Sequence, residues 1–192
     1  GERVLAASCV RMPSEGMSVI SQGERVNSNR TIVFDLLASD MPIKEQSPDP
    51  EAHFWTQAKN ADFESPSFPS SKPGAKNEIP VDSIFRDASH PSISVNLDAC
   101  IACGLCERAC KEVQVNDVIG MAKRGIDTSP VFDIEDPMGA SSCVACGECV
   151  QACPTGALME KSLINADSTK RIDYTQKKIE RVCPYSGLVS LS

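Results

Sequence analysis

The sequence has no excess of positive charge, no long apolar run and few aromatic residues. Its 192 residues include 19 Lys+Arg against 26 Asp+Glu, a formal net charge of −7. This balance argues against nucleic acid as a partner, because phosphates need a basic protein surface. No run of about 18 apolar residues occurs, so the sequence predicts no membrane span. The first residues also lack the basic and apolar regions of a secretory signal.

Motifs for nucleotide binding and for acid–base catalysis are also missing. The chain has neither a G-x-G-x-x-G loop nor a G-x-x-x-x-G-K-[ST] loop. His53 and His90 have no cysteine within several residues, which favours structural or solvated roles. The acidic residues Asp133, Glu135 and Asp136 lie where a turn is expected. We therefore predict no complete catalytic centre in this chain and, at most, a component of an oxidoreductase.

Cysteine is abundant instead, and its spacing is regular. Eight of the ten cysteines fall in two runs, CIACGLCERAC from Cys100 and CVACGECVQAC from Cys143. The runs are offset by 43 residues and are identical at seven of eleven positions. Cys9 and Cys183 stand alone near the two ends. The runs therefore form an internal repeat.

Each run has the spacing C-x2-C-x2-C-x3-C, and Pro154 follows the second one. This is the bacterial ferredoxin spacing for two 4Fe–4S clusters, in which the fourth cysteine of each run binds the cluster of the other run. Gly104 and Gly147 occupy the same place in each repeat and let the backbone approach a cluster closely. The predicted ligands are Cys100, Cys103, Cys106 and Cys153 for cluster 1, and Cys143, Cys146, Cys149 and Cys110 for cluster 2.

Two other uses of these cysteines are less favoured by the spacing. Zinc binds pairs of C-x2-C but has no use for a third cysteine two residues further on. Disulfides within such short loops would be strained. With two clusters bound by thiolates, the charge of the chain becomes about −11. Arg108 and Lys111 either raise the potential of one cluster or belong to a solvated helix face.

Residues 1–39 are predicted to be a small folded piece. Residues 4–7 and 17–21 have strand-like patterns. Apolar residues recur on one helical face after Asn29, the expected N-cap, up to a stop at Met41.

Residues 40–96 contain eight of the thirteen prolines and five of the nine aromatic residues. We interpret them as an extended ribbon pinned by its rings, with a short helix over residues 53–60. Residues 97–160 are the expected two-cluster domain, and residues 161–192 form a charged tail. Two segments are expected to pair in a small sheet, namely Ile119 and Met121 with Ala157, Leu158 and Met159.

The stretch VNLDACIACGLCERACKEVQVNDVIGMAKRG, followed later by VFDIEDPMGASSCVACGECVQACPTGALM, resembles the iron–sulfur region of NAD-dependent, molybdenum- or tungsten-containing formate dehydrogenase alpha subunits. The resemblance extends upstream through DPEAHFWTQA and SHPSISV. In that family the region relays electrons between a molybdopterin formate site and a flavin/NAD-reducing partner subunit. The resemblance implies two 4Fe–4S clusters in a cytoplasmic hetero-oligomer.

Both ends of the chain extend this resemblance. The segment ASCVRMPSEGMSVIS looks like the last part of a plant-type 2Fe–2S ferredoxin (β-grasp) domain, in which Cys9 would be the fourth ligand; the alternative is a buried thiol. VCPYSGLVSLS looks like the start of a molybdopterin domain, with Ser186 and Ser190 in place of two cysteines that follow Cys183. No cluster is expected there, because a hydroxyl is a poor iron ligand.

The expected fold class is therefore α+β: a bacterial ferredoxin-like domain, preceded by part of a β-grasp domain and a Pro-rich ribbon. Related hydrogenases have a His-Cys-Cys-Cys cluster before the paired runs, and its absence here favours the formate dehydrogenase branch. Two alternatives stay open: an independent ferredoxin-type carrier, and the iron–sulfur subunit of an NAD-linked hydrogenase.

Overall fold

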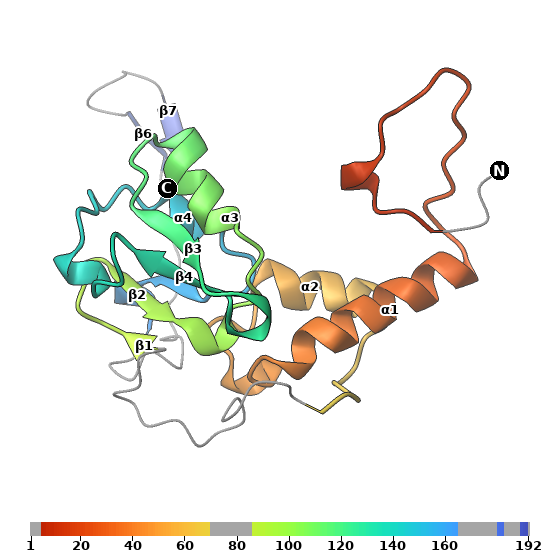
Figure 1. The fold of residues 1–192 in the computed structure, drawn as a ribbon, viewed down its shortest axis with the longest axis horizontal. Helices are drawn as coiled ribbons and strands as arrows, with labels where there is room; N and C mark the ends of the chain where they lie inside the picture. Colours follow the sequence, from red (N-terminus) through yellow and green to blue (C-terminus); the bar gives the residue numbers. More distant parts are fainter. Residues whose placement is uncertain (1–4, 70–85, 165–179, 183–188, 192) are drawn as a thin grey trace.

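The computed structural model describes residues 5–69, 86–164, 180–182 and 189–191. It has a mixed α and β architecture with two packed regions (Figure 1). A pair of helices forms one region, and small antiparallel sheets with short helices form the other. Within these residues, no helix has the length and apolar character needed to cross a bilayer.

A three-stranded antiparallel sheet contributes to the core of the cysteine-rich region. Its strand order is β1 (Arg86–Asp87), β2 (Ile93–Asn96) and β5 (Leu158–Glu160). In the register of β2 and β5, Ile93 pairs with Glu160 and Val95 with Leu158. Every residue of β2 is buried, so this strand lies at the centre of the main core.

A separate hairpin joins β3 (Ile119–Ala122) and β4 (Ser129–Phe132). The expectation that the segments after the two cysteine runs pair with each other is therefore wrong. The long insertion between the runs supplies β4 as the partner of β3, and the segment before the first run supplies β2 as the partner of β5. The expected turn after β4 is present, because the Asp136 N–H donates a 3.0 Å hydrogen bond to the Phe132 carbonyl. Asp133 in this turn also accepts hydrogen bonds from the backbone N–H and the hydroxyl of Ser142.

Short helices follow each cysteine loop. The first loop leads into α3 (Leu105–Arg108) and a π-helical turn (Ala109–Val113), and the second leads into α4 (Glu148–Ala152). A further antiparallel pair, β6 (Glu180–Val182) and β7 (Val189–Leu191), lies near the C-terminus. The remaining elements are short 3-10 helices at Ser8–Val10, Lys44–Gln46, Leu97–Ala99, Gly125–Asp127, Met138–Ala140 and Lys161–Leu163.

The helix pair consists of α1 (Glu24–Ser39) and α2 (His53–Asn60), which lie side by side in Figure 1. Phe54 is the centre of their shared core, and its ring meets Phe34 at 5.4 Å and Trp55 at 5.1 Å between ring centroids. The predicted helix over residues 53–60 is confirmed. The described part of the expected ribbon is thus partly helical, and it packs against α1.

The helix pair is attached to the cysteine-rich region through backbone contacts. The Phe54 N–H donates a 2.8 Å hydrogen bond to the Pro154 carbonyl. Gly156 approaches Asp49 so closely that a Cβ at position 156 would lie 2.8 Å from the Asp49 Cβ. The segment that follows Cys153 therefore contacts both α2 and the residues just before α2.

The N-terminal segment differs from the expectation. Residues 5–23 contain no strand, although strands were expected at 4–7 and 17–21. Helix α1 begins at Glu24, directly after Gly23 with its φ of 132°, so Asn29 lies within the helix and is not its N-cap. The helix ends at Ser39, close to the predicted stop. The apolar face that the sequence predicts for this helix is only partly buried, because Ile32, Val33 and Leu36 are exposed.

Candidate metal centres

The two cysteine loops have the same backbone conformation. Gly104 (φ 71°) and Gly147 (φ 80°) are left-handed residues that immediately precede α3 and α4. Two residues earlier, Ala102 (φ 53°) and Ala145 (φ 57°) are also left-handed. Such a conformation costs a non-glycine residue about 1–2 kcal/mol. The repeat therefore imposes the same strained loop twice.

Each loop directs a backbone N–H towards a cysteine sulfur. The Ala102 N–H donates to Cys100 Sγ, and the Ala145 N–H donates to Cys143 Sγ, both at 3.4 Å. Hydrogen bonds to the sulfurs are one means by which a protein sets the reduction potential of an iron–sulfur cluster.

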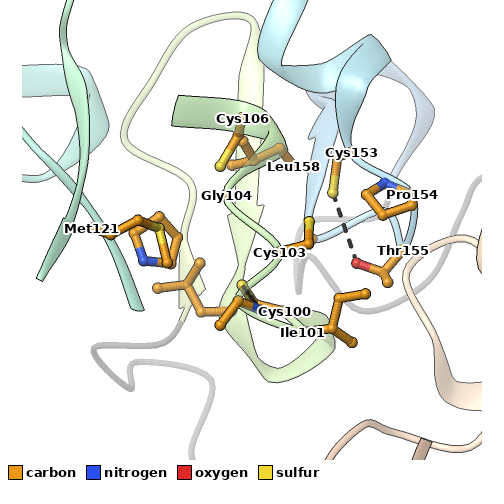
Figure 2. A pocket seen from close by; sticks show the side chains of 14 residues that line it. Cys100, Ile101, Cys103, Gly104, Cys106, Met121, Cys153, Pro154, Thr155 and Leu158 are labelled. Carbon is orange, nitrogen blue, oxygen red and sulfur yellow. Dashed lines mark hydrogen bonds between the residues drawn. The ribbon is translucent and has the colours of Figure 1, made fainter. Parts of the chain in front are cut away.

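The first cavity lies under the first loop (Figure 2). Three loop cysteines and the last cysteine of the second run line it together, and its remaining wall is largely apolar, with Met121, Pro130 and Leu158 among its residues. Its empty volume is about 370 Å³. The cysteines that line it are Cys100, Cys103, Cys106 and Cys153.

The second cavity is the counterpart under the second loop, with an empty volume of about 310 Å³. Asn116, Val118 and Ile119 contribute to its wall, and the Val118 N–H donates to Cys110 Sγ at 3.4 Å. The cysteines that line it are Cys110, Cys143, Cys146 and Cys149. Each cavity is thus formed by three cysteines of one run and the fourth cysteine of the other.

Burial suppresses ionisation of one thiol in each cavity. Burial, and then the neighbouring cysteines of the same cavity, raises the pKa of Cys106 to about 12. The same causes raise the pKa of Cys149 to about 12. Four thiolates close together repel one another and are poorly solvated. The four ionised cysteines of each cavity are therefore stable only with a positively charged group bound between them.

The donor set of each cavity suits iron–sulfur chemistry. Four sulfur donors in a mainly apolar wall match the soft ligands of a 4Fe–4S cluster and not the oxygen ligands of Mg²⁺ or Ca²⁺. In the part of the chain that the structure describes, no group of three or more metal-binding side chains converges on a single ion. The cysteines surround two spaces of similar volume instead.

Sequence reasoning did not single out Thr155, a polar residue of the first cavity. Its side chain is 1% exposed, and its Oγ1 lies 3.7 Å from Cys153 Sγ (Figure 2). The second cavity has the Asn116 amide, whose Nδ2 lies 4.0 Å from Cys146 Sγ. The signal for Thr155 was its place two residues after the last ligand, where the repeat puts Glu112 in the first run.

The charged residues near the first run are paired on the surface. Arg108 contacts Glu112 at 3.2 Å, and Lys111 contacts Asp117 at 3.5 Å. All four side chains are more than half exposed. These contacts favour the interpretation of a solvated helix face, since each cation has a carboxylate partner.

Among the described residues, neither histidine nor Cys9 lines one of the two cavities. His53 is exposed on α2, whereas His90 is buried and accepts hydrogen bonds from two backbone N–H groups. Cys9 is exposed in a 3-10 helix, so the alternative of a buried thiol is wrong. Cys183 and Ser186 lie outside the described residues.

Comparisons with known proteins agree with this geometry. Residues 99–157 match the family of 4Fe-4S dicluster domains. The putative formate dehydrogenase YrhE of Bacillus subtilis (strain 168) is 34% identical over 160 residues, which is 83% of this chain and 16% of that protein. The NADP-reducing hydrogenase subunit HndD of Solidesulfovibrio fructosivorans is 32% identical over 170 residues, which is 85% of this chain and 27% of that protein.

A third relative is the probable oxidoreductase YjgC of Bacillus subtilis (strain 168), 38% identical over 78 residues, or 41% of this chain and 8% of that protein. The chain thus spans less than a third of each of these relatives. Its fold is similar to a chain in the crystal structure of an NAD+-reducing [NiFe]-hydrogenase in the H2-reduced state, with a TM-score of 0.70 and 22% identity, covering 84% of this chain and 66% of that one. Residues 99–157 are thus similar to 4Fe–4S dicluster domains, and the chain is similar in sequence to part of a putative formate dehydrogenase and to part of an NADP-reducing hydrogenase subunit.

Proposed function

We propose that the chain binds two 4Fe–4S clusters, one in each cavity, and relays electrons through them. The observation that carries this proposal is the grouping of eight cysteines into two sets of four, each set drawn from both runs. The ligands of cluster 1 are Cys100, Cys103, Cys106 and Cys153, and those of cluster 2 are Cys143, Cys146, Cys149 and Cys110.

When bound, such clusters accept and donate single electrons over a wide range of potentials. The chain itself supplies the thiolate ligands and the backbone N–H donors, Ala102 and Ala145 among them. Because each ligand set includes a cysteine of the other run, cluster binding ties the two repeats together and stabilises the fold.

In the wider proposal, the chain is an electron-transfer part of an NAD-linked formate dehydrogenase. It passes electrons between a molybdopterin-containing catalytic subunit or domain and a flavin/NAD-binding iron–sulfur subunit, in a cytoplasmic hetero-oligomer. The similarity to YrhE supports this assignment. The proposed organisation is a dicluster domain at 97–160, a wrapping segment at 40–96 and a tail at 161–192, after a partial 2Fe–2S ferredoxin-like domain at 1–39.

A second function in the same class is favoured by two comparisons. The similarities to HndD and to the NAD+-reducing [NiFe]-hydrogenase fit an iron–sulfur subunit of a hydrogenase equally well in fold. The independent ferredoxin is less favoured, because the helix pair that carries Phe54 adds packed structure that a minimal carrier does not need.

The exchange of the fourth cysteines is tested with two double variants of the chain, purified without oxygen. Cys100→Ser with Cys153→Ser removes two ligands of cluster 1 and should leave about four of eight irons per chain. Cys100→Ser with Cys110→Ser removes one ligand from each cluster and should lower the iron content well below four. Iron and sulfide analysis, with EPR of the reduced chain, measures both.

The reverse result, with more iron in the second variant than in the first, contradicts the exchange and assigns each fourth cysteine to its own run. Cys9→Ser is the matched control, because this exposed cysteine lies outside both cavities. It should keep about eight irons. Stoichiometric zinc in the unmodified chain, without absorption near 400 nm, contradicts the clusters themselves.

The wider role is tested on the complex isolated from cells. Native mass spectrometry should show the chain, or the longer protein that contains it, together with a molybdopterin protein. Formate should reduce the clusters in that complex, whereas reduction by hydrogen and not by formate assigns the chain to a hydrogenase.

A further inference from the structure

Thr155 is a buried polar residue next to a cysteine of the first cavity. It is 1% exposed, and its hydroxyl oxygen lies 3.7 Å from Cys153 Sγ (Figure 2). A buried hydroxyl without a partner costs free energy, so this position is expected to satisfy its donor. The Cys153 sulfur is the partner that the structure provides.

The direction of this hydrogen bond follows from the state of the cysteine. In a free thiol, either the sulfur or the hydroxyl can act as the donor. A cysteine bound to iron is a thiolate and has no proton, so it can only accept. The Thr155 hydroxyl therefore donates to Cys153 Sγ whenever Cys153 is a cluster ligand.

We infer that Thr155 is a positioning residue that raises the reduction potential of cluster 1 through its hydrogen bond to Cys153. This inference rests on the proposed function, since it requires a cluster in the first cavity. A donor to a ligand sulfur stabilises the more negatively charged, reduced cluster more than the oxidised one. The Thr155 side chain is buried, and a hydrogen bond in such a low-dielectric environment is electrostatically stronger than one in water.

The repeat makes this contribution specific to one cluster. The residue equivalent to Thr155 in the first run is Glu112, which lies on the surface in an ion pair with Arg108. The fourth ligand of cluster 2, Cys110, accepts instead from the backbone N–H of Val118. A side-chain substitution can thus remove the donor from Cys153 but not the donor from Cys110.

The test compares Thr155→Val with Thr155→Ser in the iron-loaded chain, by EPR-monitored redox titration without oxygen. Valine has nearly the same shape as threonine but no hydroxyl, whereas serine keeps the hydroxyl and loses a methyl group. In Thr155→Val, we expect one of the two cluster potentials to become more negative. At the midpoint potential of that cluster in the wild type, the ratio of reduced to oxidised cluster in the variant should be about threefold to tenfold lower. A tenfold change corresponds to about 59 mV. The other cluster should be unchanged, and Thr155→Ser should titrate like the wild type.

Three results would overturn the inference: equal potentials in the valine variant and the wild type, equal shifts in the valine and serine variants, or equal shifts of both clusters. The last two would indicate a packing effect. Iron and sulfide are counted before each titration, so a chain without two clusters contradicts the proposed function and not the role of Thr155. If Thr155→Val loses iron, the comparison of Thr155→Ala with Thr155→Ser decides, since alanine also lacks the donor.

Discussion

The two cysteine loops share a backbone but differ in what covers them. Ile101 and Val144 occupy the same place in the repeat, next to the first ligand of each run. Ile101 packs against the aromatic core of α1 and α2, whereas Val144 is 64% exposed. The loop sequence therefore sets the shape of each site, and the rest of the chain sets its surroundings.

The same contrast appears after the fourth cysteine of each run. After Cys153, the Pro154 carbonyl accepts from Phe54, and Gly156 lies against Asp49, so the helix pair backs the first cavity. After Cys110 the chain leads to Val113 and Val115, which are 62% and 80% exposed. The first cavity is thus covered by the chain itself, while apolar side chains near the second one face solvent.

The largest expected loss of stability comes from adding a side-chain atom where Gly156 packs closely against Asp49, behind the first cavity. In Gly156→Ala, the new Cβ would lie 2.8 Å from the Asp49 Cβ, at a residue with a φ of 74°. The left-handed conformation and the overpacking together should cost about 2–5 kcal/mol. The measurement is the thermal unfolding midpoint of the iron-loaded chain, together with the rate of protease cleavage between residues 40 and 60.

Gly120→Ala is the matched control for this substitution. Gly120 lies in β3, and a Cβ there would have no atom within 4 Å. Its midpoint should stay near that of the wild type. Equal midpoints for the two variants would show that the helix pair is not clamped to the segment after Cys153.

A smaller effect is expected from truncating the equivalent side chains Ile101 and Val144. Ile101→Ala removes part of the packing against the helix pair and should cost about 1–2 kcal/mol, since the residue is only partly buried. Val144→Ala should stay within about 0.5 kcal/mol, because its side chain is exposed. Unfolding midpoints of the two iron-loaded variants measure the difference. Equal losses would contradict the unequal cover of the two loops.

Local rules of the sequence predicted the features that depend on a few neighbouring residues. The spacing of the runs indicated which cysteines belong together, and the structure brings those four-membered sets to two cavities. The short helix around Phe54 and the end of α1 near Met41 also followed from local patterns. These features need no information about distant parts of the chain.

Pairing between distant segments was harder to predict. Ile119 and Leu158 both follow the last cysteine of their runs, yet their strands pair with the strands of Phe132 and Val95 in different sheets. Period-two patterns do not specify a partner strand, and the insertion between the runs provided a closer one. Thr155 escaped notice for a related reason, because its role depends on burial and on the position of one sulfur, and neither is visible in a motif.

The smallest expected effect concerns pH and the second cavity. Ile93 lines this cavity, and its N–H donates to Nδ1 of the buried His90 at 3.0 Å, alongside the Ser92 N–H at 3.2 Å. Burial lowers the pKa of His90, Lys161 lowers it further, and Asp87 opposes both. A protonated Nδ1 could not accept either hydrogen bond.

The sign of the pH dependence follows from this lowered pKa. The unfolded chain binds the proton more readily than the folded one, so the contribution of His90 to stability is present above about pH 6.5 and is lost as the pH falls through the folded pKa. His90→Gln cannot titrate in this range. The thermal midpoint of the iron-loaded wild type should therefore fall more between pH 7.5 and pH 5.5 than that of the variant. The corresponding difference in the free energy of unfolding should be about 0.5–1 kcal/mol, the net contribution of one hydrogen bond. If the thermal midpoints of the wild type and the variant fall in parallel with pH, His90 does not stabilise this wall of the second cavity. Any loss of stability in acid would then come from the clusters, which are common to both cavities.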